Sequence, residues 1–269
     1  MAKQERAIRT RRRILEAAAL VFEREGYQGA TITEILRAAG VTKGALYFHF
    51  PSKEELARNI LLEQRKDLTV PQQPFRLQEM IDTGMLLTER LRTDALVRAS
   101  VRLTLDQQAR DLDRRGPFRA WSEHNLALLE AARLQGELMP HVNPAEVAEL
   151  CVGSFAGLQM MSQAMSDYRD LPQRLSVFLH HVMVAVAVPA VLVNLDLSPA
   201  RARLVAEASR AARETAPGTD PAAPPADEDV RGATPPGPAE EAAVAGVAAP
   251  AGNALPSLVP AQRTPARAG

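Results

Sequence analysis

Two short helices joined by a tight turn are predicted in the stretch TITEILRAAGVTKGALYFHF, residues 31–50. Thr31 and Glu34 have the spacing of a capping box, in which the hydroxyl accepts from the third helical amide and the carboxylate reaches back. Gly40 has no Cβ, so it can adopt the left-handed conformation that commonly ends a helix. Thr42 is placed to cap the second helix.

The second helix has the features of a DNA-reading element. Two helices joined by a turn of about three or four residues that contains a glycine form the helix-turn-helix motif, whose second helix normally lies in the major groove. Lys43 can donate to guanine edges or phosphates, and the small residues Gly44 and Ala45 let the helix approach the groove closely. Leu46 and Phe50 have the spacing of an inward face.

Other side chains in and beside the motif are placed for phosphate contacts. Tyr47 offers a hydroxyl and His49 a ring nitrogen, and residues at helix N-termini lie where amides and the helix dipole favour anions. Phe48 has an alternative interpretation as a core residue, and His49 as a solvated surface histidine. The candidate DNA contacts are Thr33, Thr42, Lys43, Gly44, Ala45, Tyr47, Phe48, His49 and Lys53.

The segments on either side complete a helical unit with a basic character. Gly26 is predicted to end the helix before the motif, and Ser52 with Glu55 forms a second capping box after it. Residues 1–66 hold 13 Lys and Arg against 8 Asp and Glu, although the whole chain of 269 residues has a formal net charge of zero. This local excess of positive charge favours a polyanionic partner.

The rest of the chain up to residue 213 is also predicted to be helical, which makes the fold all-α. The expected helices outside the motif cover residues 7–25, 53–66, 75–91, 94–108, 117–135, 144–167, 171–195 and 199–213. The helices over 144–167 and 171–195 are apolar on most sides, which indicates a second buried surface beyond the core. A symmetric homodimer supplies such a surface.

The C-terminal segment differs from the rest in composition. Residues 215–269 contain 11 prolines and show no apolar period. Such a composition cannot bury enough apolar surface to offset the entropy of ordering the chain. We therefore expect a disordered tail over these residues.

Several classes of protein are disfavoured. Cys151 is the only cysteine, so no intrachain disulfide can form and a reducing compartment is expected. The N-terminus has no apolar core of a signal peptide, and no run reaches the roughly 18 apolar residues that span a bilayer, so we expect a cytoplasmic protein with no membrane partner.

An enzyme is the first alternative class, and it finds little support. His180 and His181 are adjacent, so on a helix they point about 100° apart and cannot face one ligand. We expect no catalytic residues, no metal and no cofactor. A purely architectural DNA binder is the second alternative, but it would not need the apolar helices of residues 69–213.

The first 68 residues resemble the TetR family of one-component transcriptional repressors. The segments AKQERA, GYQ, TITEI, GVTKGALYFHF and SKEEL are similar to the γ-butyrolactone autoregulator receptor branch of that family. The resemblance implies a homodimer with a DNA-binding domain over residues 1–68 and an effector-binding and dimerisation domain over 69–214. It also implies a repressor of antibiotic biosynthesis and differentiation genes, which leaves its pseudo-palindromic operator when a γ-butyrolactone binds.

The resemblance also implies the effector contacts. Trp121, which by spacing alone is more often a core residue, would lie over the effector, and Gln64 would supply a polar contact from the DNA-binding side. Phe155 and Leu158 are the other expected contacts, and Leu158 stands where related receptors often carry threonine. The alternative is a pseudo-receptor that responds to an antibiotic or its intermediate, or a regulator that needs no effector.

Overall fold

The computed structural model describes residues 2–66, 68–110 and 112–215. Within these residues the chain forms eleven α-helices and one 3-10 helix, and it has no strand apart from an isolated bridge between Leu138 and Ala187. The all-α fold expected from the sequence is confirmed. The predicted disorder of the tail falls outside the described residues.

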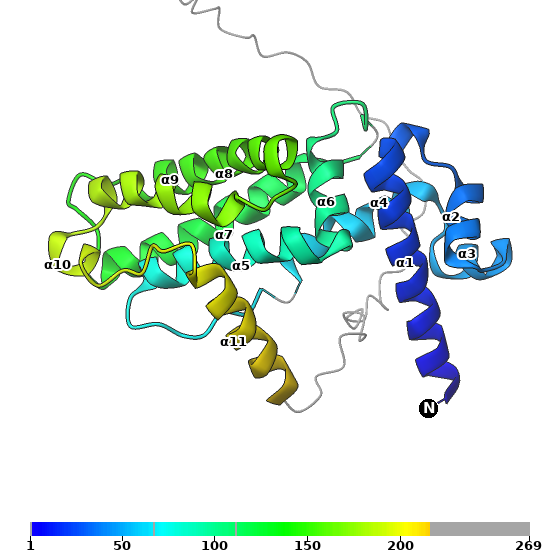
Figure 1. The fold of residues 1–269 in the computed structure, drawn as a ribbon, viewed down its shortest axis with the longest axis horizontal. Helices are drawn as coiled ribbons and strands as arrows, with labels where there is room; N and C mark the ends of the chain where they lie inside the picture. The colour runs from blue at the N-terminus through cyan, green and yellow to red at the C-terminus, as the bar shows by residue number, and fades with distance from the viewer. Residues whose placement is uncertain (1, 67, 111, 216–269) are drawn as a thin grey trace, which may run out of the picture. The chain divides into compact units, whose positions relative to one another are not determined.

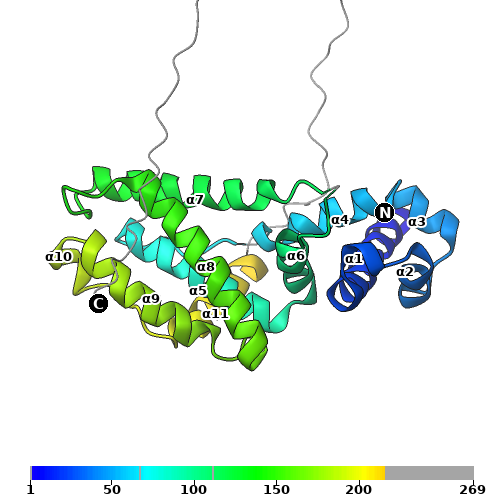
Figure 2. The same ribbon diagram turned by 90° about the horizontal axis from the view of Figure 1, so that it is seen from above.

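The elements are shown in Figures 1 and 2. In chain order they are α1 (Ala2–Gly29), α2 (Ile32–Ala39), α3 (Lys43–His49), α4 (Lys53–Leu61), η1 (Glu63–Arg65), α5 (Arg76–Thr93), α6 (Ala95–Leu105), α7 (Arg115–Leu134), α8 (Pro144–Ser166), α9 (Leu171–Val186), α10 (Pro189–Leu192) and α11 (Arg201–Thr215).

The first four helices form a small unit around an apolar core. Ile14 and Phe22 from α1 meet Ile35 from α2, together with Leu46 and Phe50 from α3 and its end. All five side chains are fully buried, which confirms the inward positions predicted for α3. The helix α6 packs against both α1 and α4, so this unit has a continuous apolar contact with the rest of the chain.

The turn between α2 and α3 has the local geometry that its sequence predicts. The amide of Glu34 donates to Thr31 Oγ1 (3.2 Å), and the amide of Thr31 donates to Glu34 Oε2 (3.0 Å), which completes the capping box. Gly40 ends α2 with φ of 60°, a left-handed conformation that needs no Cβ. At the start of α3, Thr42 Oγ1 accepts from the amide of Ala45 (3.2 Å).

The helices before and after the motif depart from expectation in detail. Gly26 has φ of 72° and interrupts α1 where a break is predicted, but one more helical turn follows it. Ser52 caps α4 by accepting from the amide of Glu55 (3.0 Å), whereas the Glu55 carboxylate accepts from Asn59, so the second capping box is only half formed. The α-helix predicted over residues 53–66 is also shorter than expected: α4 ends at Leu61, and the 3-10 helix η1 follows it.

The remaining helices enclose a second apolar core. The helix α5 packs against α7, α9 and α11, and α8 packs against α7 and α9 (Figure 2). The single helix predicted over 171–195 is wrong: α9 ends at Val186 and α10 begins at Pro189, because proline disfavours helical geometry in the residue before it. A salt bridge of 2.7 Å from Arg201 to the fully buried Asp82 fixes α11 on α5.

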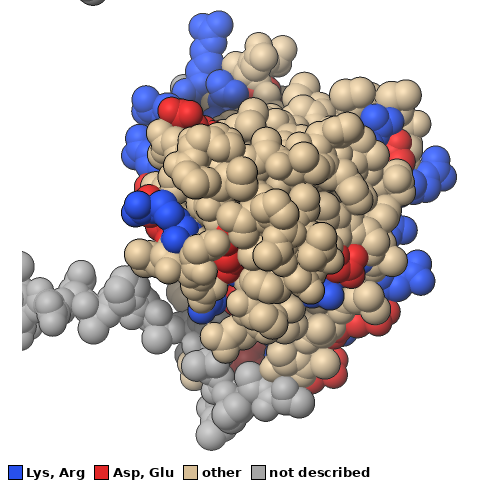
Figure 3. Space-filling view, turned by 90° about the vertical axis from the view of Figure 1, so that its left-hand side faces the viewer, with Lys and Arg blue, Asp and Glu red and all other residues tan. Residues whose placement is uncertain are grey.

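The outer sides of α8 and α9 expose many apolar side chains. The large ones are Leu150, Met160, Met161, Met165, Val177 and Val184. We call this set the α8–α9 face. At the α9–α10 end of the molecule, Figure 3 shows a surface with charged side chains mostly at its margin. Among the described helices, none combines the length and apolar character required to cross a membrane.

Candidate DNA interface and effector cavity

The exposed side of α3 carries most of the predicted DNA contacts. Lys43 and Gly44 are exposed, as is Thr42 just before them. Tyr47 is 41 % exposed and Phe48 80 % exposed. The interpretation of Phe48 as a core residue is therefore wrong, since its ring projects from the surface. A helix that presents cationic, small and apolar groups can meet base edges and thymine methyl groups.

The other candidate contacts lie around this surface. Thr33 is exposed on α2, while Ala45 and His49 are half-buried on α3. Partial burial, and to a smaller extent the nearby Arg11 guanidinium, lower the pKa of His49. The ring is therefore neutral near pH 7 and can either donate to a phosphate or accept a hydrogen bond.

Lys53 differs from the expectation of a side chain free to contact phosphate. Its Nζ donates to the backbone oxygens of Tyr27 (2.8 Å) and Ala30 (3.1 Å), and it lies 4.5 Å from the centroid of the Tyr27 ring. Burial lowers the pKa of Lys53. The ammonium group thus joins the start of α4 to the end of α1, and any phosphate must share it with these carbonyl oxygens.

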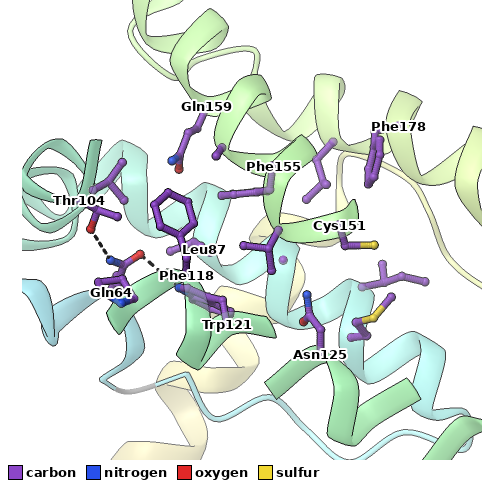
Figure 4. Close-up of a pocket in the computed structure, with 18 of the residues that line it drawn as sticks. Gln64, Leu87, Thr104, Phe118, Trp121, Asn125, Cys151, Phe155, Gln159 and Phe178 are labelled. Atoms are coloured by element: carbon purple, nitrogen blue, oxygen red, sulfur yellow. Dashed lines mark hydrogen bonds between the residues drawn. The ribbon is translucent and has the colours of Figure 1, made fainter. Parts of the chain in front are cut away.

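A cavity lies between α5, α6, α7, α8 and α9, with η1 contributing to its wall (Figure 4). It contains about 780 Å³ of empty space, a volume that includes open solvent at its mouth. The residues around it include Gln64, Met80, Ile81, Leu87, Val101, Thr104, Phe118, Trp121, Asn125, Cys151, Val152, Phe155, Gln159, Leu175, Phe178 and Leu179. Among the described residues that line the cavity, none carries a formal charge.

Gln64 and Trp121 are joined at the cavity wall, as the dashed lines in Figure 4 show. The indole Nε1 of Trp121 donates to Gln64 Oε1 (3.2 Å), and Gln64 Nε2 donates to Ser100 Oγ and Thr104 Oγ1 (3.2 Å each). Because an indole can only donate, the amide oxygen must face it, which fixes the amide orientation. Ser100 Oγ also donates to the backbone oxygen of Leu61 (2.9 Å). This Gln64 network connects α4 and η1 with α6 and α7.

The structure places three of the four predicted effector contacts at the cavity. Gln64, Trp121 and Phe155 line it, and Leu158 does not. Leu158 lies to one side of the inward stripe of α8 and packs, half-buried, against the adjacent apolar clusters. The expectation for Leu158 is therefore corrected, because Gln159, one residue further on, faces the cavity instead.

Besides Thr104 of the Gln64 network, three polar cavity residues were not singled out by the sequence as binding residues. Burial raises the pKa of the Cys151 thiol to about 11, so this group stays protonated. The side-chain amides of Asn125 and Gln159 have no hydrogen-bond partner among the described residues, and Gln159 Oε1 is buried. One sequence feature could have indicated Gln159: it follows Phe155 by four residues, on the same stripe of an apolar helix.

An exposed recognition helix, on a helical body that encloses an apolar cavity, is the architecture of a helix-turn-helix transcriptional regulator. A family model described as "Bacterial regulatory proteins, tetR family" matches residues 14–60. Over 195 residues the chain is 38 % identical to the A-factor receptor protein of Streptomyces griseus, a match that covers 72 % of this chain and 70 % of that protein. The chain belongs to the TetR family.

Two solved structures have the same fold. One is full-length TylP, a TetR regulator from Streptomyces fradiae, with 46 % identity, a TM-score of 0.71 and coverage of 76 % of this chain and 99 % of that chain. The other is a γ-butyrolactone receptor described as ArpA-like, with 29 % identity, a TM-score of 0.57 and coverage of 77 % and 99 %. The chain is thus a DNA-binding transcriptional repressor of the TetR type.

Proposed function

We propose that the protein acts as a cytoplasmic homodimeric repressor that a small effector of the γ-butyrolactone type releases from a pseudo-palindromic operator. Antibiotic biosynthesis and differentiation genes are the proposed targets, following the receptor branch that the motifs resemble. The observation that carries the proposal is an uncharged cavity whose wall includes Gln64, a residue hydrogen-bonded to elements on both sides. Residues 1–68 would bind DNA, and residues 69–214 would bind the effector and form the dimer. No catalytic role is proposed.

The cavity wall restricts the chemistry of the effector. Moving an ion out of water costs several kcal/mol unless a partner of opposite charge is present. The described cavity residues offer no such partner, so the effector is neutral. Aromatic side chains such as Phe118 and Phe178 suit an alkyl chain or ring, and a few amide and hydroxyl groups suit one or two polar atoms. A lactone with an alkyl substituent has this composition.

The α8–α9 face supports the proposed homodimer. Its exposed apolar side chains, including Met165 at 70 % and Val184 at 66 %, gain from being covered by a second copy. A dimer places two copies of α3 for successive major grooves, about 34 Å apart. An effector releases the operator when it binds better to a state in which this spacing is changed.

The Gln64 network supplies a route from the cavity to the DNA-binding helices. An effector that enters beside Trp121 can shift its indole ring, and the hydrogen bond from Trp121 to Gln64 passes that shift to η1. Gln64 belongs to η1, which directly follows α4, and Ser100 holds the carbonyl of Leu61 at the end of α4. Movement of Trp121 therefore acts on the last helix of the DNA-binding unit.

One observation favours the pseudo-receptor alternative. Both N–H groups of the Gln64 amide already donate to protein hydroxyls, so the amide offers no free donor to a lactone carbonyl. With Leu158 outside the cavity, the unpartnered amides are those of Asn125 and Gln159, which differ from the contacts that the resemblance implies. An antibiotic or its neutral intermediate is therefore the second candidate effector.

Operator release distinguishes the two candidates. The operator is first selected from random duplexes with the purified full chain, and gel shifts at physiological salt then measure its release. Release by alkyl γ-butyrolactones, at concentrations where antibiotic intermediates have no effect, is the expected result. Release by an intermediate alone favours the pseudo-receptor. If no compound on either panel releases the operator, the effector-gated repressor is refuted and an effector-independent regulator is left.

A further inference from the structure

Gln159 stands out as a buried polar group that none of the described residues satisfies. Its side chain projects from α8 into the cavity (Figure 4), and the residue is 6 % exposed. Its Oε1 is fully buried, and no described residue donates to it. Most buried polar atoms in folded proteins have a hydrogen-bond partner, so this one calls for an explanation.

The position of Gln159 argues against a partner in a second copy of the chain. It shares the inward stripe of α8 with Val152, Phe155 and Ala156, all of which line the cavity. The α8–α9 face is formed by other residues of that helix, such as Met160. The space in front of the Gln159 amide is therefore the cavity, and what fills the cavity meets the amide.

We propose that Gln159 contacts the effector directly and selects an effector with a hydroxyl or another hydrogen-bond donor. This inference rests on the proposed effector-gated function. An ether or ester oxygen can only accept, so it can serve the amide nitrogen but leaves Oε1 unpaired. A hydroxyl can donate to Oε1. Sites built to hydrogen-bond a ligand hydroxyl reject analogues without it, because the buried protein group then stays unpaired.

The selectivity can be measured with two probes that differ in one donor. One is a γ-butyrolactone with a hydroxyalkyl side chain, and the other is its methyl ether. Their affinities for the full-length chain are measured by isothermal titration calorimetry. We expect the hydroxyl compound to bind the wild-type chain about tenfold or more tightly than the ether. In Gln159→Leu this preference falls to near unity, mainly through weaker binding of the hydroxyl compound.

A matched control separates the amide from its helix. Gln163 lies one turn further along α8 and is exposed, so Gln163→Leu keeps the full preference. The ligand-free stability gives a second readout. Since leucine places an apolar side chain in an apolar wall, Gln159→Leu melts at the same temperature as the wild type or higher. A structural role for the amide predicts a lower melting temperature.

The outcomes separate this inference from the proposed function. A hydroxyl preference that survives in Gln159→Leu, or the absence of any preference in a wild-type chain that binds both probes, overturns the role of Gln159. If neither probe binds the wild-type chain, the lactone effector is refuted. The melting temperature then decides the role of Gln159: an unchanged or higher value in Gln159→Leu supports a ligand-facing amide, and a lower value overturns it.

Discussion

Replacing Gln64 with leucine removes the Gln64 network while nearly keeping the volume of the side chain. Three hydrogen bonds of 3.2 Å are lost: one from Trp121 Nε1, and two to Ser100 and Thr104. A neutral hydrogen bond contributes about 0.5–1.5 kcal/mol to stability, and a length of 3.2 Å is at the long end of the normal range. We therefore expect a loss of about 2–3 kcal/mol in the free energy of unfolding.

Two features of the site keep the loss within this range. Ser100 and Thr104 each retain the hydrogen bond in which the hydroxyl is the donor, to the backbone oxygens of Leu61 and Ser100 respectively. Trp121 is only partly buried, so water can take the place of the amide oxygen. For a folded unit of about 150–250 residues the loss lowers the melting temperature by about 4–12 °C.

The assay is thermal unfolding monitored by circular dichroism. Gln72→Leu is the control, because Gln72 is an exposed glutamine in the segment before α5. A double-mutant cycle with Trp121→Phe then isolates the indole bond, and we expect a coupling of about 0.5–1 kcal/mol. A melting temperature of Gln64→Leu equal to that of Gln72→Leu would refute the network, and strictly additive effects in the cycle would refute the indole bond.

Three further predictions concern binding and pH. Trp121→Ala keeps its operator affinity but needs about tenfold or more effector to release the operator, as measured by gel shift. If the effector releases this variant as readily as the wild type, Trp121 is not part of the effector site. Lys43→Ala lowers operator affinity about tenfold with an unchanged circular dichroism spectrum, because the exposed Lys43 loses base or phosphate contacts; equal affinity at physiological salt would contradict this role. Burial, and next Arg65, lower the pKa of His124 in the folded chain. The unfolded chain therefore takes up this proton first as the pH falls below about 6.5, and stability decreases. We expect the melting temperature to fall less between pH 7.5 and 5.5 in His124→Phe than in the wild type, and parallel curves would contradict this.

Local sequence chemistry was sufficient to predict those elements whose ends are determined by residues close by in the chain. Thr31, Gly40 and Thr42 form the caps and the left-handed turn that their spacing predicts. The break before Pro189 follows the same local rules, but the apolar run from Val182 to Val193 concealed it. Apolar periodicity alone therefore overestimated the length of that helix.

Contacts between distant segments could not be predicted from the sequence. Gln64 could be placed near the end of a helix, but its partners lie 36, 40 and 57 residues further along the chain. Periodicity also could not distinguish the cavity-facing Gln159 from its neighbour Leu158, because a shift of one residue on a helix turns the side chain by about 100°. The exposure of Phe48 likewise depends on which positions of α3 the other helices cover.

The absence of charge in the described wall of the cavity has a consequence outside the protein. A compound that binds in this cavity without a counter-charge carries no charge itself, so little free energy is spent on removing its hydration. The same lack of charge lets it pass through the hydrocarbon interior of a lipid bilayer. We therefore expect the proposed effector to enter and leave a cell without a transporter. Its concentration inside the cell follows that in the surrounding medium, so the repressor can respond to how much of the compound neighbouring cells release.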